Sequence, residues 1–126
     1  MKTTKVLLIE DDKFLSFGLK EFLMDYNMKV DIVSSAEEAL KMDKIDKFDV
    51  VLVDLRLPGI NGEEFIKKCS KKYNGLKYII YTGSSDYEID EKLDKIATLS
   101  KNILKKPFNN FKVIKNEIER IIKDKE

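Results

Sequence analysis

Acidic side chains follow two short apolar runs of this chain, and their type and position suit metal chemistry. Glu10 and Asp11 follow the first run, and Asp54 follows a run of four branched apolar residues. Carboxylates that crowd together repel one another and raise each other's pKa unless a positive charge lies between them. Mg²⁺ prefers oxygen ligands and commonly uses one or two carboxylates. The three acids therefore predict a magnesium site, provided that the fold brings them together.

Two simpler roles compete with this interpretation. Asp11 and Asp12 also fit the N-terminus of a helix, where carboxylates complement the helix dipole, and we favour this role for Asp12. The repulsion between the acids is also relieved if Lys106 alone supplies the positive charge. For Glu10, Asp11 and Asp54 together we favour the metal, because three carboxylates at strand ends exceed what helix capping requires.

A bound cation would also allow a phosphoryl group to be held beside these acids. Carboxylates form aspartyl-phosphate intermediates, and a metal neutralises charge on the phosphoryl oxygens, so Asp54 is the candidate nucleophile. Thr82 and Lys106 each follow a later apolar run. They would supply a hydroxyl donor and a second cation. Neither residue alone supports a phosphoryl site. Together they do, because they are expected at the ends of successive strands.

Strand-like and helix-like segments alternate along the chain and would position these side chains. Apolar runs typical of buried parallel strands occur at 6–9, 50–53, 78–81 and 103–104, and a weaker strand pattern occurs at 30–33. Helical spacing follows at 12–26, from a cap at Ser35, at 63–72, at about 86–100, and after a cap at Asn109 or Asn110. Five such units predict a single doubly wound parallel α/β sheet with helices on both faces. We interpret residues 1–126 as one domain, because no linker or repeat interrupts the series.

Apolar residues of the first helix and of the helix cap at Ser35 give more detailed expectations. Ser35 and Glu38 have the spacing of a capping box. The first helix is predicted to bury one stripe, made of Phe14, Leu15, Leu19, Phe22, Leu23 and Tyr26. In an open α/β sheet of this kind, ligands bind beyond the carboxyl ends of the strands, which is where the acids, the hydroxyl and the lysine are expected.

Composition excludes several classes of function. The chain has no histidine and one cysteine, so histidine–cysteine metal clusters, Ser-His-Asp triads and internal disulfides are ruled out. A net charge of +1 gives no bulk electrostatic reason to bind nucleic acid. No apolar run approaches the length of a membrane span, and no signal peptide is visible, so a cytoplasmic location is expected.

Taken in order, these motifs resemble the receiver domains of two-component response regulators. The matching stretches are VLLIEDD at 6–12, DLRLPGING at 54–62, TG at 82–83 and KPF at 106–108. Each stretch is weak alone, but four in order, with family-like spacing over essentially the whole chain, are specific. The resemblance implies a flavodoxin-like sheet of five strands in the order 2-1-3-4-5 with five helices.

The resemblance also implies a role for each residue at the strand ends. Asp54 would be the phosphoacceptor, Thr82 the switch hydroxyl and Lys106 an ion-pair partner. The ligands of Mg²⁺, or alternatively Mn²⁺, would be Glu10, Asp11, Asp54 and the backbone carbonyl of Arg56.

Three backbone and side-chain details follow from the same resemblance. The peptide bond before Pro107 is expected to be cis. Gly62 is expected to occupy a position with positive φ after the Pro58 loop. Ile103 is a departure, because the family usually carries there an aromatic residue that reorients when the threonine moves.

The expected partners follow from the phosphoryl chemistry. A histidine kinase or a histidine phosphotransfer protein would donate the phosphoryl group, since this chain has no histidine. The switch would act on a downstream protein or on an output domain missing from this sequence, as a monomer or a phosphorylation-dependent dimer. Direct contact with nucleic acid or membrane is not expected. Catalysis would be limited to self-catalysed phosphotransfer and slow autodephosphorylation.

Three rival functions remain open at this point. A Mg²⁺-dependent phosphohydrolase with an Asp nucleophile often carries its acid/base carboxylate two residues later, where this chain has Arg56. A flavodoxin-like cofactor carrier would need a phosphate cradle after the first strand, where three acids stand instead. A pseudo-receiver that only binds partners would be expected to have lost its acids.

Overall fold

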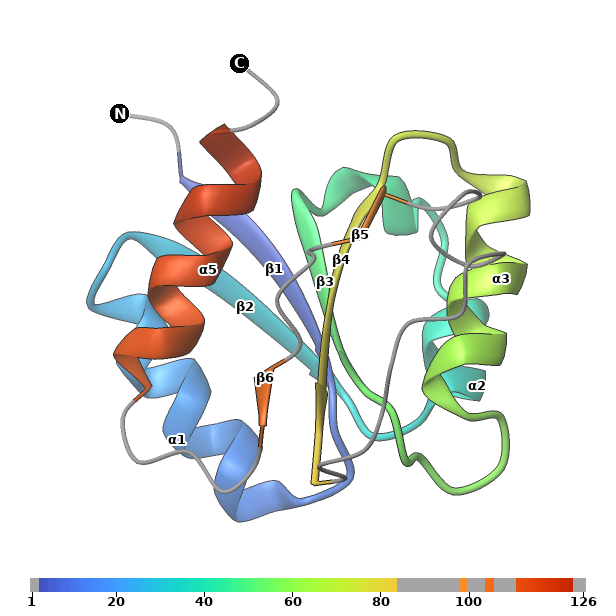
Figure 1. Cartoon of the computed structure of the whole chain (residues 1–126), viewed down its shortest axis with the longest axis horizontal. Helices are drawn as coiled ribbons and strands as arrows, with labels where there is room; N and C mark the ends of the chain where they lie inside the picture. The colour runs from blue at the N-terminus through green and yellow to red at the C-terminus, as the bar shows by residue number, and fades with distance from the viewer. Residues whose placement is uncertain (1–2, 84–97, 100–103, 106–110, 124–126) are drawn as a thin grey trace.

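Four parallel strands form the centre of the sheet. The computed structural model describes residues 3–83, 98–99, 104–105 and 111–123. Strands β1 (Thr4–Ile9), β2 (Met28–Val33), β3 (Val50–Asp54) and β4 (Lys77–Thr82) lie in the order β2-β1-β3-β4 (Figure 1). All their pairings are parallel, so the predicted flavodoxin-like α/β class and the order of these four strands are confirmed. Their carboxyl ends lie together at the bottom of Figure 1.

The fifth place in the sheet differs from the prediction. Two short strands pair with β4 there: β5 (Thr98–Leu99) with its first residues and β6 (Leu104–Lys105) with its last. Paired residues differ by 21 in number at β5 and by 23 at β6, so the two pieces do not continue one register. The fifth strand expected at 103–104 is confirmed at Leu104, which lies in β6, whereas β5 is an additional strand that was not predicted.

The helix expected at about 86–100 is also corrected at its end. Thr98 and Leu99 belong to β5 and pair in parallel with β4, because backbone pairing with a neighbouring strand outweighs helical spacing at this edge. The rest of that expected helix, and with it the predicted count of five helices, lies outside the described residues, as do Ile103 and the expected caps Asn109 and Asn110.

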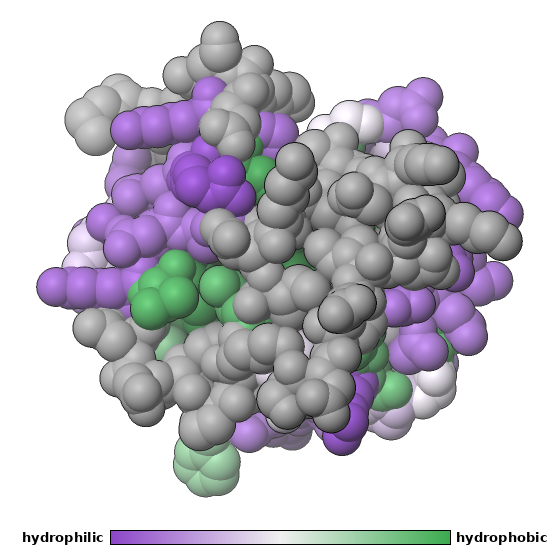
Figure 2. Space-filling model, viewed as in Figure 1, coloured by the Kyte–Doolittle hydropathy of each residue, from purple (hydrophilic) through white to green (hydrophobic). Residues whose placement is uncertain are grey.

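Helices cover both faces of the sheet. Helices α1 (Lys13–Met24) and α5 (Lys112–Lys123) lie on one face, and α2 (Ala36–Leu40) and α3 (Gly62–Lys72) lie on the other, while a short 3₁₀ turn, η1 (Ile45–Lys47), precedes β3 (Figure 1). Hydrophilic side chains cover much of the visible outer side on the left and right, and a small apolar group lies over the lower part of α5 (Figure 2). Within the described ranges, no helix has the length and hydropathy needed to cross a bilayer.

Alternation along the strands divides the core into two halves and sets the side on which the acids lie. Leu8 of β1 and Leu52 of β3 pack in the half beneath α1 and α5, together with Tyr81 of β4. Successive strand side chains point to opposite faces, so Glu10 and Asp54, two residues after these leucines, continue toward the same side. Ordinary strand geometry thus places both acids and Tyr81 on one face.

Helix α1 buries a narrower stripe than its sequence predicts. Leu19 and Leu23 are buried, but Phe14 is 95% exposed. One residue along a helix is a rotation of about 100°, which turns Phe14 away from the stripe that begins at Leu15. Tyr26 lies beyond the last helical residue, Met24, and is 36% exposed. The predicted stripe is therefore wrong at both ends.

Side-chain caps begin the first two helices where the sequence expects them. One carboxylate oxygen of Asp12 accepts hydrogen bonds from the backbone N–H groups of Phe14 and Leu15, at 3.0 and 3.2 Å. The Ser35 hydroxyl accepts from the N–H of Glu38 at 3.1 Å. The Glu38 carboxylate accepts the backbone N–H of Ser34 at 3.2 Å and the Ser34 hydroxyl at 3.0 Å, so the second bond of the predicted capping box comes from the residue before the N-cap and not from Ser35. The capping role favoured for Asp12 is confirmed.

Tyr78 gives a test of the core that is independent of any function. Its side chain is fully buried under α3, and within the described residues no hydrogen bond of ordinary geometry reaches its hydroxyl. Burial raises the pKa of this phenol above its usual value. The raised pKa means that the folded state keeps a proton that the unfolded state loses above pH ~10, so this contribution to stability is complete below that pH and is lost as the pH rises further.

We expect Tyr78→Phe to unfold at the same or a higher urea concentration at neutral pH, because a buried hydroxyl beside the weakly hydrogen-bonding thiol of Cys69 contributes little there. The variant should also lose part of the alkaline fall in stability. Urea unfolding at neutral and alkaline pH checks both effects. A large loss of stability at neutral pH would contradict this description of the core.

Candidate functional site

Three carboxylates converge at the carboxyl edge of the sheet. One carboxylate oxygen each of Glu10, Asp11 and Asp54 lies within 4.8 Å of the others. Glu10 and Asp54 are only 2% and 5% exposed, while Asp11 is exposed to solvent. The strand order reverses between β1 and β3, and the acids lie at the carboxyl ends of these two strands. Ligands usually bind at this position in open α/β sheets. The predicted convergence of the three acids is confirmed.

Glu10 is held by hydrogen bonds at both of its oxygens. Its Oε2 accepts the backbone N–H of Asp12 at 2.9 Å, and its Oε1 accepts the hydroxyl of Tyr81 at 2.9 Å. Burial, and then the negative charge of Glu10, raise the pKa of Tyr81 well above its ordinary value. The phenol therefore keeps its proton and acts as a donor to the carboxylate.

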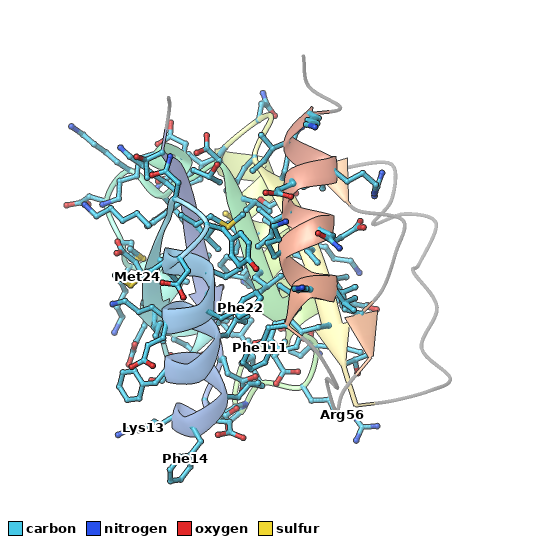
Figure 3. The ribbon with its side chains drawn as sticks, turned by 90° about the vertical axis from the view of Figure 1, so that its left-hand side faces the viewer. Lys13, Phe14, Phe22, Met24, Arg56 and Phe111 are labelled. Carbon is cyan, nitrogen blue, oxygen red and sulfur yellow. The ribbon has the colours of Figure 1, made fainter. Side chains whose placement is uncertain are left out.

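The loop that follows β3 folds back onto Asp54. The Asp54 Oδ1 accepts the backbone N–H of Arg56 at 3.1 Å. The N–H of Leu55 donates to the carbonyl of Tyr81 at 3.0 Å, and the carbonyl of Leu55 accepts the N–H of Gly62 at 3.0 Å. These bonds fix the turn directly after Asp54. The side chain of Arg56 is exposed and points away from the body of the protein (Figure 3).

Gly62 is required at this site for a reason that differs from the predicted one. The glycines with positive φ in the described residues are Gly59 and Gly75, so the expectation of a positive φ at Gly62 is wrong. Instead, Gly62 begins α3 against the end of β3. A Cβ atom there would lie 2.8 Å from the carbonyl oxygen of Asp54 and 3.0 Å from the Cα of Leu55. The position needs glycine because two backbone segments approach closely.

Helix α2 also holds the loop after β3. The carboxylate of Glu37 accepts the backbone N–H of Ile60 through Oε2 at 3.2 Å. Gly59, with φ +77°, allows the loop to turn beside this side chain. The Pro58 loop is therefore fixed from two sides, by Glu37 and by the bonds next to Asp54.

The other two predicted site residues have different outcomes. Thr82 is the last residue of β4 and is fully buried. It follows Tyr81, whose register partner on β3 is Asp54, so Thr82 lies next to the acidic edge. Lys106 and the expected cis bond before Pro107 lie outside the described residues. The last residue described before them is Lys105, which pairs with Thr82.

Tyr81 and Glu37 are site residues that the sequence interpretation missed. Tyr81 has a signal in hindsight, since a phenol inside an otherwise apolar buried strand normally needs a hydrogen-bond partner. Glu37 has no comparable signal. It occurs beside Glu38 in a polar helix, and only the packing of α2 against the loop distinguishes the two glutamates.

The arrangement fits a hard divalent cation. Two buried carboxylates and one exposed carboxylate crowd together, and their mutual repulsion is relieved when a positive ion lies between them. Oxygen ligands with room for water suit Mg²⁺.

The family model described as the response regulator receiver domain matches residues 6–119. Among curated proteins, the cell cycle transcriptional regulator CtrA of Caulobacter vibrioides is 30% identical over 110 residues, covering 87% of this chain and 47% of CtrA. The two-component response regulator PhoP of Pseudomonas aeruginosa is 29% identical over 104 residues, covering 82% and 45%. The chain thus spans less than half of either regulator.

Solved structures agree with this match. The non-phosphorylated HemR receiver domain from Leptospira biflexa superposes with a TM-score of 0.78 at 30% identity, covering 95% of this chain and 94% of that one. The response regulator TrrA from Thermotoga maritima, in complex with Mg(2+)-BeF, gives a TM-score of 0.80 at 28% identity over 94% and 99% of the two chains.

The match over nearly the whole chain favours the receiver interpretation over the phosphohydrolase and the cofactor carrier. The acidic edge at Glu10, Asp11 and Asp54 fits the phosphoacceptor site of this family. The chain belongs to the response regulator receiver domains of two-component signalling.

Proposed function

We propose that Asp54 accepts a phosphoryl group in a site that holds Mg²⁺, and that this change switches the conformation of the domain. The supporting observation is the convergence of three carboxylates at one edge, with Asp54 buried among them. The donor is the phosphohistidine of a histidine kinase or of a histidine phosphotransfer protein, since this chain has no histidine of its own.

The transfer exchanges one bond for another. A carboxylate oxygen of Asp54 forms the new O–P bond while the N–P bond of the phosphohistidine breaks, and the imidazole keeps the electron pair of that bond. The bond from the Arg56 N–H to Oδ1 holds the carboxylate in a fixed orientation for the attack. Positioning and charge stabilisation account for most catalysis in such transfers.

The cation is assigned to the three acids and one backbone oxygen. Its ligands are Glu10, Asp11, Asp54 and the carbonyl of Arg56. When bound, Mg²⁺, or Mn²⁺ in its place, supplies positive charge beside the transferred phosphoryl group. Burial of Glu10 and Asp54 supports this assignment, because charged groups shielded from water interact more strongly with an ion.

Thr82 and Lys106 are proposed to bind the phosphoryl group once it is attached to Asp54. The Thr82 hydroxyl donates to a phosphoryl oxygen, and Lys106 pairs with the added charge. A conformation that makes both contacts binds phosphorylated Asp54 better, so phosphorylation shifts the population toward it. The recipients of the switch are a downstream protein or an output domain in the part of the full-length relatives that this chain does not span.

Phosphorylation of the wild-type chain tests the proposal. We expect incubation with acetyl phosphate and Mg²⁺ to add one phosphoryl group, measured as intact mass, and we expect excess chelator to prevent the gain. The group should be lost on brief alkaline treatment, since an acyl phosphate hydrolyses readily. A gain that is indifferent to chelator, or no gain with any acyl-phosphate or phosphoramidate donor, would contradict the proposed site.

A further inference from the structure

Tyr81 connects β4 with the acidic edge through its side chain. It is 1% exposed, and its hydroxyl lies 2.9 Å from Oε1 of Glu10 and 3.3 Å from the carbonyl oxygen of Ile9. A phenol has one proton to donate. The carboxylate is the nearer acceptor and carries charge, so the proton is directed to Glu10.

The two hydrogen bonds at Glu10 fix the plane of its carboxylate. The backbone N–H of Asp12 donates to Oε2 at 2.9 Å, and the hydroxyl of Tyr81 donates to Oε1. The first bond comes from the chain just after Glu10 and is available whatever side chain Asp12 has. The second comes from another strand and depends on a single side chain.

Tyr81 also contacts the strand that carries Asp54 through its backbone. It is the register partner of Asp54 in the pairing of β3 with β4. Its carbonyl accepts the N–H of Leu55 at 3.0 Å. One residue of β4 therefore holds the Glu10 side chain and the backbone that directly follows Asp54, and Thr82 is its neighbour in sequence.

We propose that Tyr81 is a positioning residue that orients the Glu10 carboxylate for the divalent cation and so strengthens metal binding. The inference rests on the proposed magnesium site. Side chains that hydrogen-bond to metal ligands hold them in the geometry that the ion requires, and their loss commonly weakens binding by about 10- to 100-fold. Without the Tyr81 hydroxyl, Glu10 would lose the bond at Oε1 and its carboxylate would turn more freely.

Binding of Mn²⁺ to the unphosphorylated protein tests the inference without any enzymatic readout. Free Mn²⁺ is measured by electron paramagnetic resonance during titration of wild type, Tyr81→Phe and Tyr78→Phe. We expect Tyr81→Phe to bind about 10-fold more weakly, or weaker still. Tyr78→Phe is the matched control, because it removes a buried hydroxyl from the same strand on the side away from the acids, and it should bind as wild type does.

A spectroscopic signature separates positioning from a general effect on packing. A cation beside Glu10 changes the charge on the carboxylate that accepts the Tyr81 hydroxyl, so Mg²⁺ should change the near-ultraviolet absorption of this tyrosine. Wild type and Tyr78→Phe should show this difference spectrum, and Tyr81→Phe should not. The aromatic ring is kept in both variants, and urea unfolding establishes that each is folded.

The outcomes distinguish this inference from the proposed function. If wild type binds Mn²⁺ and Tyr81→Phe binds it equally well or more tightly, the positioning role is overturned and the metal site stands. A wild-type protein that binds Mn²⁺ but gives no tyrosine difference spectrum also overturns the role, whether or not the variant folds. If wild type binds no Mn²⁺, the proposed metal site itself fails.

Discussion

Replacing Asp54 with asparagine is expected to abolish phosphorylation of the chain by acetyl phosphate. An amide oxygen is neither charged nor nucleophilic enough to form the acyl phosphate, and the variant keeps the neighbouring carboxylates Glu10 and Asp11 unchanged. Intact mass measured with Mg²⁺ present should show no added phosphoryl group on Asp54→Asn under conditions in which the wild type is modified.

The variant should remain folded, which makes the result interpretable. Neutralising one of three crowded carboxylates relieves repulsion in the absence of metal, so Asp54→Asn should unfold at the same or a higher urea concentration than wild type. Asp46→Asn is a matched control, since it makes the same chemical change at an exposed residue of η1 and should be phosphorylated normally. Persistence of the mass gain in Asp54→Asn would place the acceptor elsewhere.

Gly62→Ala is expected to destabilise the fold. The added Cβ would lie 2.8 Å from the carbonyl oxygen of Asp54 and 3.1 Å from a methyl carbon of Val53. The first of these neighbours is backbone, which cannot turn aside as a flexible side chain can. Overpacking of this kind costs typically about 1–3 kcal/mol, and urea unfolding measures the change.

Gly83→Ala is the control for this substitution. A Cβ at Gly83 meets no described atom within 4 Å, and the glycine is exposed at the end of β4. We expect its free energy of unfolding to change little. We also expect Gly62→Ala to slow phosphorylation of Asp54, because the displaced carbonyl belongs to the acceptor residue itself. Equal stability of the two variants would mean that the approach of α3 to β3 is looser than the structure indicates.

The central strands and the acidic edge were predictable because their causes are local. Continuous runs of branched apolar residues, such as the first four residues of β3, favour buried parallel strands in any context. Parallel strands also bring their carboxyl ends to one edge, so polar residues after each run must lie near one another. Nothing about the three acids required knowledge of side-chain packing.

The features that were wrong depend on neighbours distant in sequence. Thr98 and Leu99 carry a helical pattern, yet they pair with the start of β4. The sequence correctly indicated that position 62 needs glycine, but it predicted a positive φ as the reason. The actual reason is the close approach of α3 to Asp54, which is a contact between two segments and not a property of the loop alone.

The α/β class follows from the residue pattern alone, and so does the prediction that Glu10, Asp11 and Asp54 lie together and can bind a cation. Local hydrophobic pattern and the geometry of parallel strands are sufficient for those results. The hydrogen bonds that hold the acids in place, in contrast, come from residues far away in the sequence. The hydroxyl of Tyr81 reaches Glu10 across 71 residues of sequence, and Glu37 reaches the loop after Asp54 across 23. Such bonds depend on which side chains meet when helices and strands pack, and this is fixed by the fold as a whole.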